Sequence, residues 1–140
     1  SEMRGIPLRL EMGPRDIEND ECVLVRRDTF EKITVKLENL EEKIAELLED
    51  IQQNMYDTCK KRMEAKTTIA HNLEEFKNNM DKEQGLIKTM WCGSAECEEK
   101  IKELTGAKSR CMPFEQEHLG DTCVCCGKKA DKMVVWGRQY

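Results

Sequence analysis

The sequence is poor in aromatic residues and has no long apolar segment. Phe, Trp and Tyr together make up 5% of its 140 residues, and the hydrophobic share of 39% is below that of a typical globular domain. No apolar run approaches the ~20 residues that a transmembrane helix needs. The first residues also lack the basic-then-hydrophobic pattern of a secretory signal. We therefore expect no membrane span and no secretory signal, and we expect a cytoplasmic protein.

Histidines and catalytic motifs are scarce as well. The two histidines are His71 and His118, and the sequence contains no Ser-His-Asp arrangement and no phosphate-cradling glycine loop. Taken alone, the chain therefore lacks the residues of a complete enzyme. Positive charge is also in deficit, because 23 basic residues against 28 acidic ones give a net charge of -5. Any contact with nucleic acid must then be local and shape-dependent, and no DNA partner is expected.

Cysteine, by contrast, is abundant. Six of the eight cysteines lie between residues 92 and 126. A disulfide framework is typical of secreted, loop-rich proteins, whereas this chain has no secretory signal and places Cys125 directly beside Cys126. A metal site in a reducing compartment is the better interpretation.

The spacing of the C-terminal cysteines is that of a tetrahedral metal site. Two close pairs of thiolates suit zinc, and four sulfur ligands leave no position open for a substrate. We therefore predict a structural Zn2+ ion bound by Cys92, Cys97, Cys123 and Cys126. Cys125 is the alternative fourth ligand, although the Cys-x-x-Cys-Gly order favours Cys126 because it forms a tight knuckle. His118 is a less favoured substitute.

In the first half of the chain, the spacing of apolar residues changes from every second position, as in a strand, to every third or fourth position, as in a helix. Residues 5–12 alternate, which predicts a strand with Arg9 and Glu11 on one face. The other face is expected to bury Ile6, Leu8, Leu10 and Met12. Residues 22–27 and 32–35 predict a β-hairpin. From 36 to 66, apolar residues recur every three or four positions without Gly or Pro, which predicts one long amphipathic helix.

The second half predicts a compact α+β unit. The patterns indicate helices and strands in alternation, with helices over 73–80 and 95–105 and strands over 86–91, 109–114 and 133–136. A core of about 70 residues is marginal without a covalent or metal staple, which agrees with the predicted zinc site.

Two groups of motifs are more specific than these patterns. The first consists of residues 5–16 (GIPLRLEMGPRD) and 25–29 (VRRDT). The second consists of residues 91–93 (WCG), 97–98 (CE), 106–110 (GAKSR), 123–128 (CVCCGK) and the terminal Tyr140. Together they closely resemble the prolyl-tRNA synthetase family in its archaeal/eukaryotic type, which some bacteria also use, and the resemblance extends over essentially the whole chain.

The resemblance implies a C-terminal fragment of a proline–tRNA ligase, which attaches proline to tRNA(Pro) using ATP. The class II catalytic domain, with its ATP and Mg2+ sites, is expected upstream and absent. The implied partners are tRNA(Pro) and that missing catalytic domain, and the parent ligase is expected to be a homodimer. In this family the terminal tyrosine, here Tyr140, turns back toward the active site.

The implied fold class is α/β (α+β), in two parts. Residues 1–66 match the end of the anticodon-binding domain, a partial mixed sheet with strands within 5–35 and a long helix over 36–66. Residues 67–140 match a small α+β zinc-stapled domain.

By position in the shared motif, four residues match those that contact the guanines of the proline anticodon: Glu2, Arg9, Arg15 and Lys32. The residue types suit this role, because arginine presents a planar fork to guanine O6 and N7, glutamate accepts from N1 and N2, and lysine supplies a strong donor. Arg26 and Arg27 are candidates for contacts with the RNA backbone. Phe30 stands where the family commonly has glycine, which affects the hairpin turn that places Lys32.

A second interpretation is a zinc-stapled protein-interaction module with a helical arm, which the net charge of -5 suits equally well. Residues 5–16 and 25–29 favour the ligase, because a generic interaction module has no reason to carry them.

Overall fold

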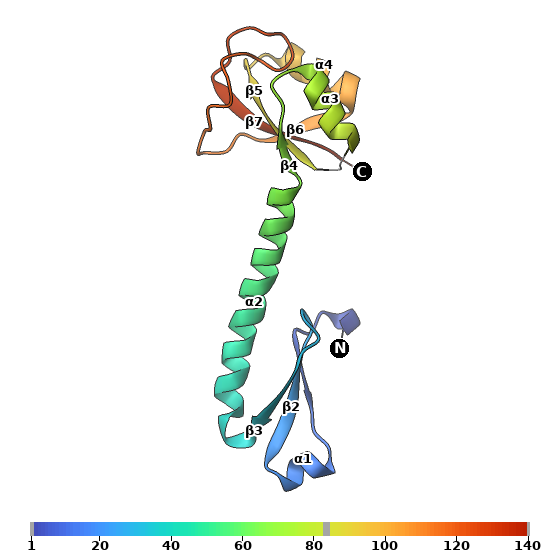
Figure 1. The fold of residues 1–140 in the computed structure, drawn as a ribbon, viewed down its shortest axis with the longest axis vertical. Coiled ribbons are helices and arrows are strands. Elements are labelled where there is room, and N and C mark those ends of the chain that lie inside the picture. The colour runs from blue at the N-terminus through green and yellow to red at the C-terminus, as the bar shows by residue number, and fades with distance from the viewer. Residues whose placement is uncertain (1, 83–84, 140) are drawn as a thin grey trace. The chain divides into compact units, whose positions relative to one another are not determined.

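The structure, a computed structural model, describes residues 2–82 and 85–139, and it divides the chain into two compact units, Ser1–Lys61 and Arg62–Tyr140 (Figure 1). The long helix α2 (Leu40–Ala65) contributes residues to both units. The domain boundary expected at residue 66 remains a prediction. None of the helices among the described residues is both long enough and apolar enough to cross a bilayer.

The first unit is built on a three-stranded antiparallel sheet in the order β1-β2-β3. Its strands are β1 (Leu8–Glu11), β2 (Glu21–Arg26) and β3 (Lys32–Lys36). The predicted hairpin is confirmed as β2 and β3. Two short helices precede the hairpin: the 3-10 turn η1 (Glu2–Arg4) and α1 (Pro14–Glu18). Helix α1 was not predicted, and it begins at Pro14, whose fixed φ suits the first helical position.

The 26-residue helix α2 follows a 3-10 turn, η2 (Leu37–Asn39), so the predicted long helix is confirmed with a tighter first turn. Its apolar stripe packs on one face of the sheet, where Leu24, Val35 and Leu47 form the buried core. Each such side chain contributes about 1.5–3 kcal/mol when fully buried.

The predicted burial along β1 is largely wrong. Leu8 packs against the core of the unit, but Ile6, Leu10 and Met12 are exposed by 42%, 44% and 44%. The physical reason is that the core contributed by α2 lies over β2 and β3, and that Ile6 and Met12 lie outside the strand itself.

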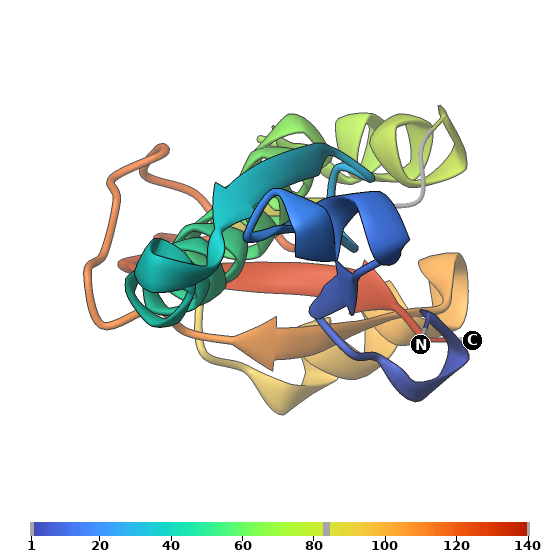
Figure 2. The same ribbon diagram turned by 90° about the horizontal axis from the view of Figure 1, so that it is seen from below.

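The second unit contains a mixed four-stranded sheet in the order β4-β5-β7-β6. Its strands are β4 (Thr67–Ile69), β5 (Leu86–Trp91), β6 (Ala107–Cys111) and β7 (Lys132–Arg138). Strand β4 runs parallel to β5, and the other neighbours are antiparallel. Figure 2 shows β6 beside β7 in orange and red. The strand expected over 109–114 ends at Cys111, and Phe114 beyond it is fully exposed.

Helices α3 (Leu73–Lys82) and α4 (Ala95–Thr105) provide Phe76 and Ile101 to the core of this unit. Trp136 lies at its centre, fully buried, edge-on to Phe76 with 6.2 Å between ring centroids. Its indole N–H donates to Thr89 Oγ1 at 2.9 Å, so the one polar atom of the ring is satisfied. This core supports β5 and α4, the two elements that position the first cysteine pair.

Candidate functional site

Four cysteine side chains converge at one end of the second unit. The sulfur atoms of Cys92, Cys97, Cys123 and Cys126 all lie within 4.8 Å of one another. Cys92 follows β5, Cys97 lies in the first turn of α4, and the other two belong to one tight turn. These four can hold a single metal ion, which agrees with the predicted spacing.

Two similar backbone knuckles present the sulfurs. Gly93 follows Cys92 with φ of 85°, and Gly127 follows Cys126 with φ of 68°, a left-handed conformation that glycine adopts without a Cβ penalty. Each glycine directs the backbone N–H of the next residue toward the sulfur of the cysteine before it. The N–H of Ser94 therefore donates to the Cys92 sulfur, and the N–H of Lys128 donates to the Cys126 sulfur. The sequence predicted a tight backbone at the glycine after the second pair, whereas the equivalent position of Gly93 was missed.

The thiols of the cluster differ in their surroundings. Burial raises the pKa of Cys97 far above its ordinary value, and burial likewise raises the pKa of Cys92. The hydrogen bond from the backbone N–H of Lys128 instead lowers the pKa of the exposed Cys126 thiol to about 7. Buried thiolates need a positive partner, and a coordinated cation supplies one.

The remaining candidate ligands lie outside this cluster. The side chain of Cys125 packs against the apolar core, whereas that of Cys126 joins the other three sulfurs. His118 is exposed, and its Nε2 lies 3.2 Å from Asp121 Oδ1. The geometry therefore favours the set that the spacing predicted.

The first unit brings two of the expected anticodon-contacting residues into one row. Arg9 on β1 lies opposite Val25 on β2, and Val25 lies opposite Lys32 on β3. Both cations therefore lie on the sheet face that does not carry the α2 core. Glu11, in the next row of β1 on the same face, contacts both: its carboxylate accepts from Arg9 Nη2 at 2.6 Å and from Lys32 Nζ at 3.3 Å. These two hydrogen bonds lower the pKa of Glu11, and the bond from Arg9 has the larger effect.

The other expected contacts are not brought into this row. Arg15 lies on α1, between β1 and β2, where it is exposed and makes no side-chain bond with the described residues. Glu2 opens η1, but its side chain lies outside the described part of the structure, and so does Tyr140.

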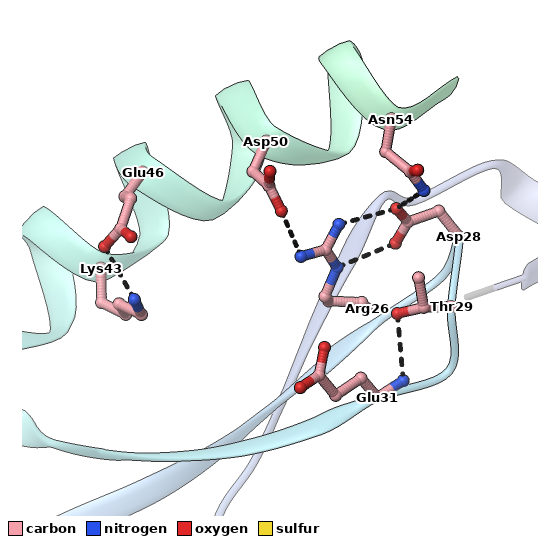
Figure 3. Close-up of polar contacts among 8 residues, drawn as sticks. All are labelled: Arg26, Asp28, Thr29, Glu31, Lys43, Glu46, Asp50 and Asn54. Carbon is pink, nitrogen blue, oxygen red and sulfur yellow. Dashed lines mark hydrogen bonds and ion pairs between the residues drawn. The ribbon is translucent and has the colours of Figure 1, made fainter. Parts of the chain in front are cut away.

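Arg26 does not have the role suggested for it. Only 7% of this residue is exposed, so it cannot serve the RNA backbone. Its guanidinium donates to both oxygens of Asp28, at 3.0 and 2.8 Å, and also to Asp50 on α2 (Figure 3). Asn54, one turn along α2, donates to Asp28 at 2.7 Å. The ion pair with Arg26 lowers the pKa of Asp28 to about 2. Arg26 therefore ties the hairpin to the helix, whereas Arg27 remains half-exposed.

Phe30 adopts a conformation that only glycine takes at no cost. Its φ of 61° lies in the left-handed region, and 65% of the residue is exposed. The hairpin nevertheless closes, because Arg26 N–H bonds Glu31 O at 3.0 Å and Lys32 pairs with Val25. Lys32 therefore keeps its place in the row despite the missing glycine.

Comparison with known proteins identifies both units. The family model described as "Anticodon binding domain" matches residues 1–47, and the model described as "Prolyl-tRNA synthetase, C-terminal" matches residues 73–140. "Proline--tRNA ligase" of Clostridium botulinum (strain ATCC 19397 / Type A) is 55% identical over 139 residues, which are 99% of this chain and 29% of that protein. "Proline--tRNA ligase 2" of Bacillus cereus is 55% identical with the same coverage of both chains, and the ligase of Clostridium novyi (strain NT) is 54% identical.

An anticodon-binding sheet and helix followed by a four-cysteine domain define the class as the C-terminal region of a class II aminoacyl-tRNA synthetase. The chain spans 29% of the length of the curated relatives it matches, and neither matched domain is a catalytic one. The chain belongs to the prolyl-tRNA synthetase family and carries the end of the anticodon-binding domain together with the C-terminal domain. This result confirms the resemblance and sets aside the interaction module.

Proposed function

We propose that this chain supplies anticodon recognition and a zinc-stabilised C-terminal domain to a cytoplasmic ligase that joins proline to tRNA(Pro) at the expense of ATP. The observation that carries the proposal is the row of Arg9 and Lys32 on the face opposite the α2 core, in a sheet that matches an anticodon-binding domain. ATP and Mg2+ would act in the ligase's catalytic domain.

Each residue has a distinct part in the proposed recognition. The guanidinium of Arg9 offers two parallel N–H groups to O6 and N7 of a guanine, and Lys32 adds one charged donor nearby. Arg15, exposed on α1, supplies a second fork, and Glu2 accepts from the N1 and N2 donors of guanine. The side chains of Arg9 and Lys32 are 41% and 63% exposed, so a base can reach them.

The ion that we propose for the cysteine cluster is zinc, in a structural role. Tetrahedral ligands at a Zn–S distance of about 2.3 Å lie roughly 3.8 Å apart. The Cys92 sulfur lies 3.7 Å from that of Cys97 and 3.7 Å from that of Cys126, so the donor set fits. Because four sulfurs fill the coordination shell, the ion would stabilise the domain and take no substrate.

Substituting Arg15 with alanine tests the recognition proposal in a complete ligase. A suitable ligase is the Clostridium botulinum relative with its 139 matching residues replaced by this chain. We expect Arg15→Ala to cost about 1–3 kcal/mol in aminoacylation efficiency, the value of a good bidentate base contact. The difference in aminoacylation efficiency between tRNA(Pro) and transcripts with replaced anticodon guanines should become smaller, while the rate of proline activation by ATP stays unchanged.

Arg62→Ala, on an exposed position of α2, is the matched control and should leave that difference unchanged. If Arg15→Ala keeps the full preference for the guanines, Arg15 is a surface charge. If the Arg15→Ala ligase no longer activates proline, Arg15 stabilises the fold instead of contacting the anticodon.

A further inference from the structure

Glu11 is an acidic residue in the middle of a surface that is proposed to bind RNA. Its side chain is 40% exposed, and it contacts both Arg9 and Lys32. A carboxylate at this place repels phosphate groups, so a surface evolved only for affinity would not carry it. It belongs neither to the four matched anticodon contacts nor to the core.

The register of the sheet explains the position of Glu11. Arg9 and Glu11 are two residues apart on β1, so their side chains share a face. Glu11 lies opposite Val23, one row along from the row of Arg9, Val25 and Lys32. The carboxylate therefore reaches back along its own strand to Arg9 and diagonally across β2 to Lys32, which fixes both cations relative to the sheet.

We propose that Glu11 is the positioning residue of this recognition face: its carboxylate holds Arg9 and Lys32 in the arrangement that distinguishes guanine from other bases. The inference rests on the proposed function and names the residue that gives it specificity.

Two physical effects follow from this arrangement. Long basic side chains lose rotamer freedom when they bind, and a partner that holds them beforehand removes part of that cost for the base that fits. The negative charge also weakens the sequence-independent attraction for phosphate, which every RNA shares. The first effect therefore raises the affinity for the correct anticodon relative to the wrong one, whereas the second lowers the affinity for both and leaves their ratio unchanged.

The test is binding of this chain to RNA hairpins that present either the proline anticodon or the same loop with adenine in place of its guanines. Glu11→Gln keeps the size of the side chain and removes its charge. We expect the affinity ratio between the two hairpins to fall about threefold to tenfold, a part of the discrimination that a bidentate contact provides. The affinity for the guanine-free hairpin should stay equal or rise up to about twofold, because one repulsive charge is lost.

Glu21→Gln is the matched control. Glu21 forms a similar cross-strand ion pair with Lys36 at 3.5 Å, at the other end of the same hairpin. This variant should leave the ratio unchanged. Glu11→Asp keeps the charge on a shorter side chain and should restore part of the ratio.

The outcomes separate the two proposals. If the unsubstituted chain does not prefer the guanine hairpin, the proposed function fails. If it does prefer that hairpin and Glu11→Gln keeps the full ratio, the inference about Glu11 is overturned. Equal weakening of both hairpins together with a lower Tm also overturns it, because that result indicates a purely structural role.

Discussion

Removing the carboxylate of Asp28 should destabilise the first unit strongly. The side chains of Arg26 and Asp28 are only 9% and 5% exposed, and three hydrogen bonds converge on that carboxylate. Breaking a buried ion pair from one side costs about 3–5 kcal/mol, because the remaining charge stays buried. Asp50 also accepts from Arg26, which offsets part of this cost. We therefore expect Asp28→Ala to lose about 2–4 kcal/mol.

The pH dependence gives a second measure of the same interaction. The ion pair with Arg26 lowers the pKa of Asp28 from 3.8 to about 2. At about 1.4 kcal/mol per pKa unit, this lowering corresponds to roughly 2.5 kcal/mol. Because the pKa is lowered by folding, the stabilisation is complete above about pH 4 and is lost as the pH falls toward 2. The difference between wild type and Asp28→Asn should shrink over that interval.

Hydrogen exchange resolved to peptides of β2, β3 and α2 is the appropriate assay, because both tryptophans lie in the other unit. Asp50→Asn is the matched control: it removes a carboxylate from the same guanidinium, but one whose side chain is 59% exposed. That control should cost about 0–1 kcal/mol. If Asp50→Asn lowers the stability of the first unit as much as Asp28→Ala or more, the reasoning from burial is refuted.

Three further predictions concern the turn, the metal and a close backbone contact. Phe30→Gly should stabilise the first unit by about 0.5–1 kcal/mol in urea unfolding, because the cost of a left-handed conformation exceeds the extra entropy of unfolded glycine. A loss of stability would contradict the inference that Phe30 is strained. Cys126→Ser should abolish bound zinc in elemental analysis while Cys125→Ser retains it, and the reverse result would exchange the two ligands. A Cβ on Gly85 would lie 2.0 Å from the Lys66 carbonyl oxygen, so Gly85→Ala should lower the stability of the second unit by about 1–3 kcal/mol. Unfolding followed by tryptophan fluorescence measures this loss, and an unchanged unfolding midpoint would exclude that contact.

The metal site was the most predictable feature because its information is local. Each cysteine pair closes a short loop, so the spacing alone specifies that two sulfurs meet. The sequence also predicted the long helix and the hairpin, since both depend on periodicity over neighbouring residues. Strand β4 was missed because its three residues are too few to show a period, and it depends on parallel pairing with β5.

The surroundings of the charged side chains were not predictable from local pattern. Arg26, like Arg9, lies in a β-prone run, yet its partner Asp50 lies 24 residues later on a helix that covers only one face. The link from Glu11 to Lys32 depends on strand register over 21 residues. Both contacts arise from tertiary packing, so only the three-dimensional fold separates the buried arginine from the accessible one.

The most direct test of the account is to map which residues of this chain respond to an RNA hairpin that presents the proline anticodon. Amide and side-chain NMR signals should shift at Arg9, Arg15 and Lys32. Signals of Leu47, in the core on the opposite face of the sheet, should stay unchanged. Replacement of the anticodon guanines should abolish these shifts. Equal shifts with the guanine-free hairpin, or shifts confined to the unit that carries the four cysteines, would contradict recognition by this face.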